Sequence, residues 1–198
     1  MHLKLGCIAA THTNLDREAK PKYNNTGDMV MKFNPYIYGH DDLRIPVAVI
    51  PMAEDDARKT EDSWQTSWAS EYLADPRLEK YAVKLDDELI ALGAYEVQEF
   101  ALVVHIVYME AQPESNPTIA GKDRKYRGIG RLLIAFGIKL SVDNGFGGDV
   151  VLEAKTPELA KHYEKDFGAV RLPIFMSSAP RLLIADEAAK RIFFSYLE

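Results

Sequence analysis

The sequence predicts an α+β protein of mixed α/β type, with a central, mostly antiparallel sheet and flanking helices. Alternating strand-like segments at residues 80–85, 89–97 and 101–110 are joined by short turns, which is typical of an antiparallel meander. A strand–helix–strand–helix–strand order follows, with an apolar helix at residues 130–143 before a strand at residues 149–154. The apolar fraction of 47% and charged fraction of 27% are ordinary for a globular domain, so neither suggests a fibrous or disordered chain.

The other elements follow from the same local signals. Prolines bracket residues 45–51, which we expect to form a short buried strand. Residues 53–73 have helical composition, and Trp64, Trp68 and Tyr72 recur every four residues, so we expect one long helix with an aromatic face. The remaining expected elements are a helix from the cap Thr156 to Gly168, strands at residues 170–176 and 181–185, and a helix at residues 186–198.

The length of 198 residues suits one domain, which we place at residues 45–198 after an N-terminal extension at residues 1–44. No apolar run approaches the roughly 18 residues that a membrane span requires, so we expect no membrane partner. The single cysteine excludes an internal disulfide, and we therefore expect a reducing, cytoplasmic location.

The charge balance argues against nucleic acid as a partner. The chain has 30 acidic and 24 basic residues, for a net charge of −6, which favours a cationic partner such as an amine. Positive charge is nevertheless concentrated in one ten-residue segment, which contains Lys122, Arg124, Lys125, Arg127 and Arg131.

This basic segment contains two glycines, Gly128 and Gly130, where the apolar helix begins. A helix N-terminus binds anions through its free N–H groups, and glycines let a phosphate approach the backbone closely. A nucleotide P-loop would need Lys after the last glycine, where Arg131 stands, and a dinucleotide fingerprint would need a glycine in place of Leu133. Both fail, which leaves another phosphate site or glycines that only relieve packing.

The segment "KYRGIGRLL", followed about 35 residues later by "AKHYEKDFGA", resembles the Gcn5-related N-acetyltransferase (GNAT) superfamily. Its signature is Arg/Gln-x-x-Gly-x-Gly/Ala, and the resemblance covers about residues 80–169. It implies the GNAT acyl-CoA N-acyltransferase fold, with acetyl-CoA as co-substrate and no metal. Lys125 departs from the signature, and we expect its charge to stay near a phosphate without the planar fork of arginine.

The resemblance also assigns binding residues. Backbone amides of the glycine loop would hold the pyrophosphate, and a strand that splays from its neighbour would pair with the pantetheine arm. The strand positions are Val107, Tyr108 and Met109. The loop positions are Lys125, Tyr126, Arg127, Gly128, Ile129, Gly130, Arg131 and Leu132.

The catalytic candidates are Tyr163 and Glu110. The resemblance implies that Tyr163 protonates the departing thiolate, although a buried structural tyrosine is the alternative. Glu110 ends the long strand near the expected thioester, where a carboxylate can serve as general base, although such a residue can also be merely solvated. His105, five residues earlier, is expected on the opposite face of the strand. No cluster has the spacing of a metal site.

The predicted function is N-acetyl transfer from acetyl-CoA to an amine, directly in a ternary complex. The acceptor is a small-molecule or protein amine, held by residues 53–73 and 172–185, and a homodimer stays open. The alternative is a non-catalytic acyl-CoA-binding sensor or scaffold module with the same fold, which the irregular connection at residues 111–123 keeps open.

Overall fold

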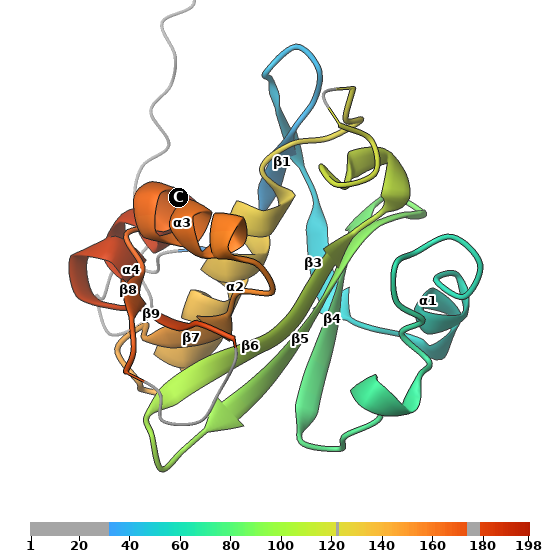
Figure 1. Cartoon of the computed structure of the whole chain (residues 1–198). Helices are drawn as coiled ribbons and strands as arrows, with labels where there is room; N and C mark the ends of the chain where they lie inside the picture. Colours follow the sequence, from blue (N-terminus) through green and yellow to red (C-terminus); the bar gives the residue numbers. More distant parts are fainter. Residues whose placement is uncertain (1–31, 122, 174–178) are drawn as a thin grey trace, which may run out of the picture. The chain divides into compact units, whose positions relative to one another are not determined.

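The computed structural model describes residues 32–121, 123–173 and 179–198. Within them a seven-stranded sheet has the order β3-β4-β5-β6-β7-β9-β8 (Figure 1). Only β6 and β7 are parallel; every other neighbouring pair is antiparallel. The strands are β3 (Ala48–Pro51), β4 (Leu78–Leu85), β5 (Glu88–Gln98), β6 (Val103–Ala111), β7 (Val150–Glu153), β8 (Val170–Arg171) and β9 (Arg181–Ile184).

The predicted fold class is confirmed, because the meander β4-β5-β6 passes through helix α2 (Ile129–Asp143) into parallel β7. Helices α3 (Pro157–Phe167) and α4 (Asp186–Phe194) lie with α2 on one side of the sheet, and α1 (Glu54–Arg58) lies on the other (Figure 1). The larger apolar core lies around α2, and a smaller one lies under α1. None of the described helices is long and apolar enough to cross a membrane.

The helix boundaries follow their predicted caps. The Thr156 hydroxyl accepts a hydrogen bond from the Leu159 amide at 3.2 Å, which satisfies one of the free N–H groups at the start of α3. Gly168 ends the same helix in the left-handed conformation, with φ of 70°. Helix α2 ends at Asp143, as the Asn144-Gly145 pair predicted.

The long helix predicted at residues 53–73 is wrong. Only α1 and a short 3-10 helix, η1 (Glu71–Leu73), form there. The Thr60 hydroxyl donates to the Ala57 carbonyl at 2.6 Å and accepts from the Trp68 amide at 2.9 Å. Such side-chain bonds compete with helix continuation. The aromatic face is therefore broken, with Trp68 buried and Tyr72 63% exposed.

Residues 32–44, which we assigned to the extension, belong to the compact unit Lys32–Glu198. Strand β1 (Tyr36–Tyr38) pairs with β2 (Arg44–Pro46), so the run at residues 45–51 is divided between two sheets. Bridges join Phe33 to Leu197 and Tyr38 to Arg127. The segment thus links the C-terminal residues to the glycine loop, and residues 1–31 of the predicted extension lie outside the described residues.

Two C-terminal elements are shorter than predicted. Strand β8 covers only Val170–Arg171, and residues 174–178 of the predicted strand lie outside the described residues. Helix α4 ends at Phe194 instead of residue 198, because the following residues pair with the N-terminal segment. The Asn34 backbone N–H donates to the Tyr196 carbonyl at 2.7 Å, and the Glu198 backbone N–H donates to the Lys32 carbonyl at 3.1 Å.

Candidate active site

Strands β6 and β7 diverge after Ile106. Their register pairs Val104 with Val150 and Ile106 with Leu152, and no later pair joins them. Strand β6 continues to Ala111 in contact with β5 alone. Over the described residues, the β7-facing edge of β6 therefore has no strand partner from Val107 onward. Peptide groups on such an edge can pair with another extended chain, and the predicted pantetheine-binding residues 107–109 lie here.

A β-bulge marks the same point. Tyr95 pairs with Ile106 and Ala94 with Tyr108, so Val107 is an additional residue on β6. Ile106 belongs to the core around α2, whereas Tyr108 belongs to the core under α1. The bulge thus turns the side chain of Tyr108 toward the α1 side of the sheet.

This bulge corrects the expected placement of His105 relative to Glu110. Alternation over five residues would put them on opposite faces, but the additional residue reverses the alternation. His105 contacts Glu153 at 2.7 Å and lies opposite Glu96 in the register. Both His105 and Glu110 consequently belong to the α1 side of the sheet.

Gly128 and Gly130 have different structural roles. Gly128 precedes α2 with φ of 81°, and a Cβ there would lie 3.0 Å from Cδ2 of Tyr38. Its conformation therefore requires glycine. A Cβ at Gly130 would meet no atom within 4 Å, so packing within the described residues does not explain why a side chain is missing there.

The first turn of α2 has free donors. The first helical bond runs from the Leu132 amide to the Gly128 carbonyl at 3.0 Å. In the part of the chain that the structure describes, the amides of Gly128, Ile129, Gly130 and Arg131 donate no hydrogen bond. Together with the open space at Gly130, these amides form a cradle suited to a phosphate.

Glu88 ties this loop to the end of β6. Its Oε1 accepts from Lys125 Nζ at 2.6 Å and from Gln112 Nε2 at 3.0 Å, while Oε2 accepts from the Tyr126 hydroxyl at 3.1 Å. Although burial opposes it, these bonds hold the pKa of Glu88 below its ordinary value. The glycine loop and the opening beside β6 therefore lie at one end of the sheet, and the Lys125 charge is paired with Glu88.

Of the other described arginines of the basic segment, one is paired and two form no ion pair with the described residues. Arg127 forms an ion pair with Asp42 at 2.6 Å and donates to the Gly39 carbonyl at 3.0 Å. Arg124 and Arg131 form no ion pair with any described residue, and the buried Nε of Arg124 has no hydrogen-bond partner. A buried donor without a partner is costly, which favours an anion near this loop.

Tyr163 lies on α3 with its ring buried against Phe167, at a centroid distance of 6.0 Å. Its hydroxyl makes no hydrogen bond with the described residues. Burial raises the pKa of Tyr163 to about 12, so the hydroxyl carries its proton at neutral pH. This is the protonation state that a proton donor needs.

Glu110 is buried, with 4% of its surface exposed, and organises the segment after α1. Its Oε1 accepts from the Gln65 backbone N–H at 2.6 Å, and Oε2 accepts from Trp68 Nε1 at 3.2 Å. The neighbouring Tyr108 hydroxyl bonds to the Thr66 hydroxyl at 2.8 Å. Gln65 and Thr66 could not be predicted as part of the site from the sequence, because no local pattern connects this segment to β6.

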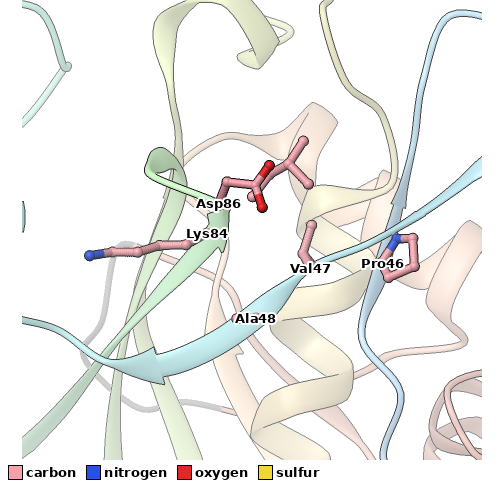
Figure 2. Close-up of a pocket in the computed structure, with 6 residues that line it drawn as sticks. Pro46, Val47, Ala48, Lys84 and Asp86 are labelled. Atoms are coloured by element: carbon pink, nitrogen blue, oxygen red, sulfur yellow. The ribbon is translucent and has the colours of Figure 1, made fainter.

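A shallow depression lies elsewhere, beside β3 and the β4–β5 turn (Figure 2). None of the predicted site residues lines it. Lys84, on its rim, forms an ion pair with the buried Asp56 at 2.7 Å. Its lining residues are Pro46, Val47, Ala48, Lys84, Leu85 and Asp86.

Comparison with solved structures shows that this arrangement is the fold of the GNAT acetyltransferases. The ribosomal-protein-S18-alanine N-acetyltransferase from Escherichia coli is 12% identical, with a TM-score of 0.50 over 71% of this chain and 95% of that chain. The PaiA N-acetyltransferase from Thermoplasma acidophilum, in complex with coenzyme A, is 11% identical, with a TM-score of 0.51 over 72% and 100%.

A third similar structure is AAC(6')-Ib in complex with paromomycin and acetyl-CoA. It is 17% identical, with a TM-score of 0.52 over 73% of this chain and 96% of that chain. Sequence comparison finds no matching family model and no matching curated protein. The likeness thus lies in the fold, and the functional argument depends on this chain's own site.

Proposed function

We propose that the protein is an N-acetyltransferase that uses acetyl-CoA as co-substrate and transfers the acetyl group directly to an amine. One observation carries the proposal: the free edge of β6 beyond Ile106 and the free amides of residues 128–131 lie at the same end of the sheet. An unpaired strand edge suits an extended amide-containing arm, and a free helix N-terminus suits a phosphate. Acetyl-CoA combines both chemistries in one molecule.

The loop fits the pyrophosphate through its backbone. We assign the binding positions to residues 125–132, where the amides of Gly128 to Arg131 are free and Gly130 leaves room for close approach. The unpaired guanidinium groups of Arg124 and Arg131 supply positive charge. Lys125 is paired with Glu88, so it contributes to holding the loop in place. Along β6, the backbone of residues 107–109 would pair with the pantetheine amides.

Acetyl transfer needs a neutral amine, a polarised thioester and a proton for the leaving thiolate. We assign the last task to Tyr163, because its hydroxyl is protonated and makes no competing hydrogen bond with the described residues. A carboxylate has about four lone-pair positions, and two of those on Glu110 are engaged. The remaining positions can accept the ammonium proton, so we assign Glu110 as general base.

The acceptor is proposed to be a small-molecule or protein amine that reaches the α1 side of β6. The similar structures include an alanine N-acetyltransferase of a ribosomal protein and a complex with the aminoglycoside paromomycin. These two structures support a protein amine and a small-molecule amine, respectively, as acceptor classes. The net charge of −6 favours attraction of cationic amines.

Thermal unfolding with and without nucleotides tests the cofactor assignment. A ligand that binds only the native state at a hundredfold excess over Kd stabilises it by about 2.7 kcal/mol. We expect acetyl-CoA to raise the Tm, and equal concentrations of NAD and ATP to leave it unchanged.

A panel of amines, assayed by mass spectrometry of the products, then tests transfer. Binding of acetyl-CoA without any acetylated amine would instead favour the sensor module.

A further inference from the structure

The Lys155 side chain lies on the ring of Tyr108 across the opening between β6 and β7. Lys155 follows β7 by two residues, and its Nζ is 3.9 Å from the centroid of the Tyr108 ring. Tyr108 is the first β6 residue beyond the bulge at Val107. The ammonium group therefore lies where the strands have already separated, beside the positions 107–109 assigned to the pantetheine arm.

No carboxylate of the described residues forms an ion pair with this ammonium group. Glu153 is engaged by His105 at 2.7 Å and by Arg181 at 3.2 Å. Each oxygen of Glu110 accepts one hydrogen bond from the segment after α1 and keeps a further lone pair, but no ion pair joins Glu110 to Lys155. Lys155 itself is exposed and forms no ion pair with any described residue. A single exposed cation–π contact is a weak restraint, so the amine can leave the ring.

We propose that Lys155 is an acetyl acceptor in cis, which makes this residue a site of self-acetylation. The inference rests on the proposed function. The ε-ammonium loses one proton to the Glu110 carboxylate, and the nitrogen lone pair attacks the thioester carbonyl carbon of acetyl-CoA. The C–N bond forms and the C–S bond breaks. The thiolate leaves with its electron pair and takes a proton from Tyr163, and the acylated nitrogen releases its second proton to the Tyr163 phenolate, which restores the phenol. The products are Nε-acetyl-Lys155 and free CoA.

The flexible four-carbon stem of lysine makes this transfer geometrically simple, because the amine can move off the ring while its backbone stays in place. Acetylation would also remove the cation from the face of Tyr108. In the modified protein, the Lys155 charge should consequently no longer compete with an amine from solution for that aromatic face.

The test is incubation of the full chain with deuterated acetyl-CoA, followed by peptide mass spectrometry. We expect the label on Lys155, with a first-order rate constant that does not change when the protein is diluted tenfold, as an intramolecular reaction requires. Lys161, an exposed lysine on α3, serves as the internal control and should acquire the label at least tenfold more slowly. Heat-denatured protein should lose this difference, because the fold no longer selects one amine.

Matched variants separate catalysis from simple reactivity. Lys155→Arg keeps a cation over Tyr108 but should eliminate the label, whereas Lys161→Arg should leave the label at Lys155 unchanged. Tyr163→Phe should slow labelling of Lys155 by at least tenfold. Similar labelling of the two lysines in the native protein would overturn the inference.

The failure of this inference is distinguishable from failure of the proposed function. If amines in solution are acetylated while Lys155 of the same sample stays unlabelled, self-acetylation is wrong and the acetyltransferase assignment stands. If acetyl-CoA neither raises the Tm nor labels any amine, the proposed function fails, and this inference fails with it.

Discussion

The carboxylate of Glu110 and the indole of Trp68 are joined by a hydrogen bond of 3.2 Å, although 42 residues separate them in the sequence. The other carboxylate oxygen accepts the Gln65 amide at 2.6 Å. The segment between α1 and η1 has little regular secondary structure, so these two bonds fix its position against β6. The Glu110 side chain thus connects the segment between α1 and η1, part of the proposed acceptor-binding region, to β6, the strand that would hold the thioester.

Replacement of this residue, Glu110→Gln, should reduce both stability and turnover. The glutamine side chain offers one acceptor oxygen for two donors, and leaving the buried Trp68 indole N–H unsatisfied costs about 1–3 kcal/mol. Loss of the proposed general base should also lower kcat/KM for the amine by about 100-fold, within the range typical of acid–base catalysis. Urea unfolding and steady-state kinetics measure the two effects.

The matched control for this variant is Glu114→Gln. Glu114 is exposed, and its side chain forms no hydrogen bond or ion pair with the described residues, so stability and turnover should stay at the parent values. Full turnover in a destabilised Glu110→Gln protein would contradict the catalytic role. Glu110 would then only hold the segment between α1 and η1 in place.

The two glycines should respond differently to alanine. Gly130→Ala adds a methyl group into open space within the first turn of α2, where alanine is favoured over glycine by roughly 0.5–1 kcal/mol. The Tm should therefore stay constant or rise. Affinity for acetyl-CoA, measured by calorimetry, should fall at least about tenfold, equivalent to 1.4 kcal/mol, because the methyl group would lie where the phosphate is proposed to approach.

Gly128→Ala provides the contrast. Its φ of 81° and the 3.0 Å approach to Tyr38 predict a strained, less stable protein even without ligand. Equal acetyl-CoA affinity in Gly130→Ala and the parent would refute a phosphate at this cradle, and the glycine would then have no binding role.

Much of the fold was predictable because its signals are local. Alternation defined the β4-β5-β6 meander, and the Thr156 and Gly168 caps defined α3. The aromatic spacing at residues 64–72 predicted a helix that does not form, because Thr60 bonds to the backbone of Ala57 and Trp68 and stops the helix. Tertiary contacts overrode a helical pattern there.

The site was predictable only in part. The glycine pair identified the start of α2, but its relation to β6 depends on Glu88, which bonds to residues on two other segments. The bulge at Val107 has no signature in a single sequence, and it reverses the faces expected for His105 and Glu110. Lys155 was missed for the same reason, because its contact with Tyr108 crosses two strands that are distant in sequence.

Removal of the Tyr163 hydroxyl distinguishes an enzyme from a binding module. In Tyr163→Phe the buried ring still packs against Phe167, and the lost hydroxyl made no hydrogen bond with the described residues, so the Tm and the Kd for acetyl-CoA should stay at the parent values. Turnover of a working amine should fall by about 100-fold, in kcat and not in the KM for acetyl-CoA, since the proton is needed only in the transition state.

The pH dependence gives a second measurement on the same variant. Burial raises the pKa of Tyr163 to about 12 from its ordinary value of 10.0, so the folded protein holds this proton more tightly than the unfolded chain. The resulting stability is fully present below about pH 10 and is lost as the pH rises toward about 12, on the order of 2–3 kcal/mol in total. Tyr163→Phe should flatten this alkaline loss in urea unfolding. Full activity together with an unchanged alkaline slope would show that Tyr163 neither donates the proton nor titrates as a buried group, and water would then be the donor.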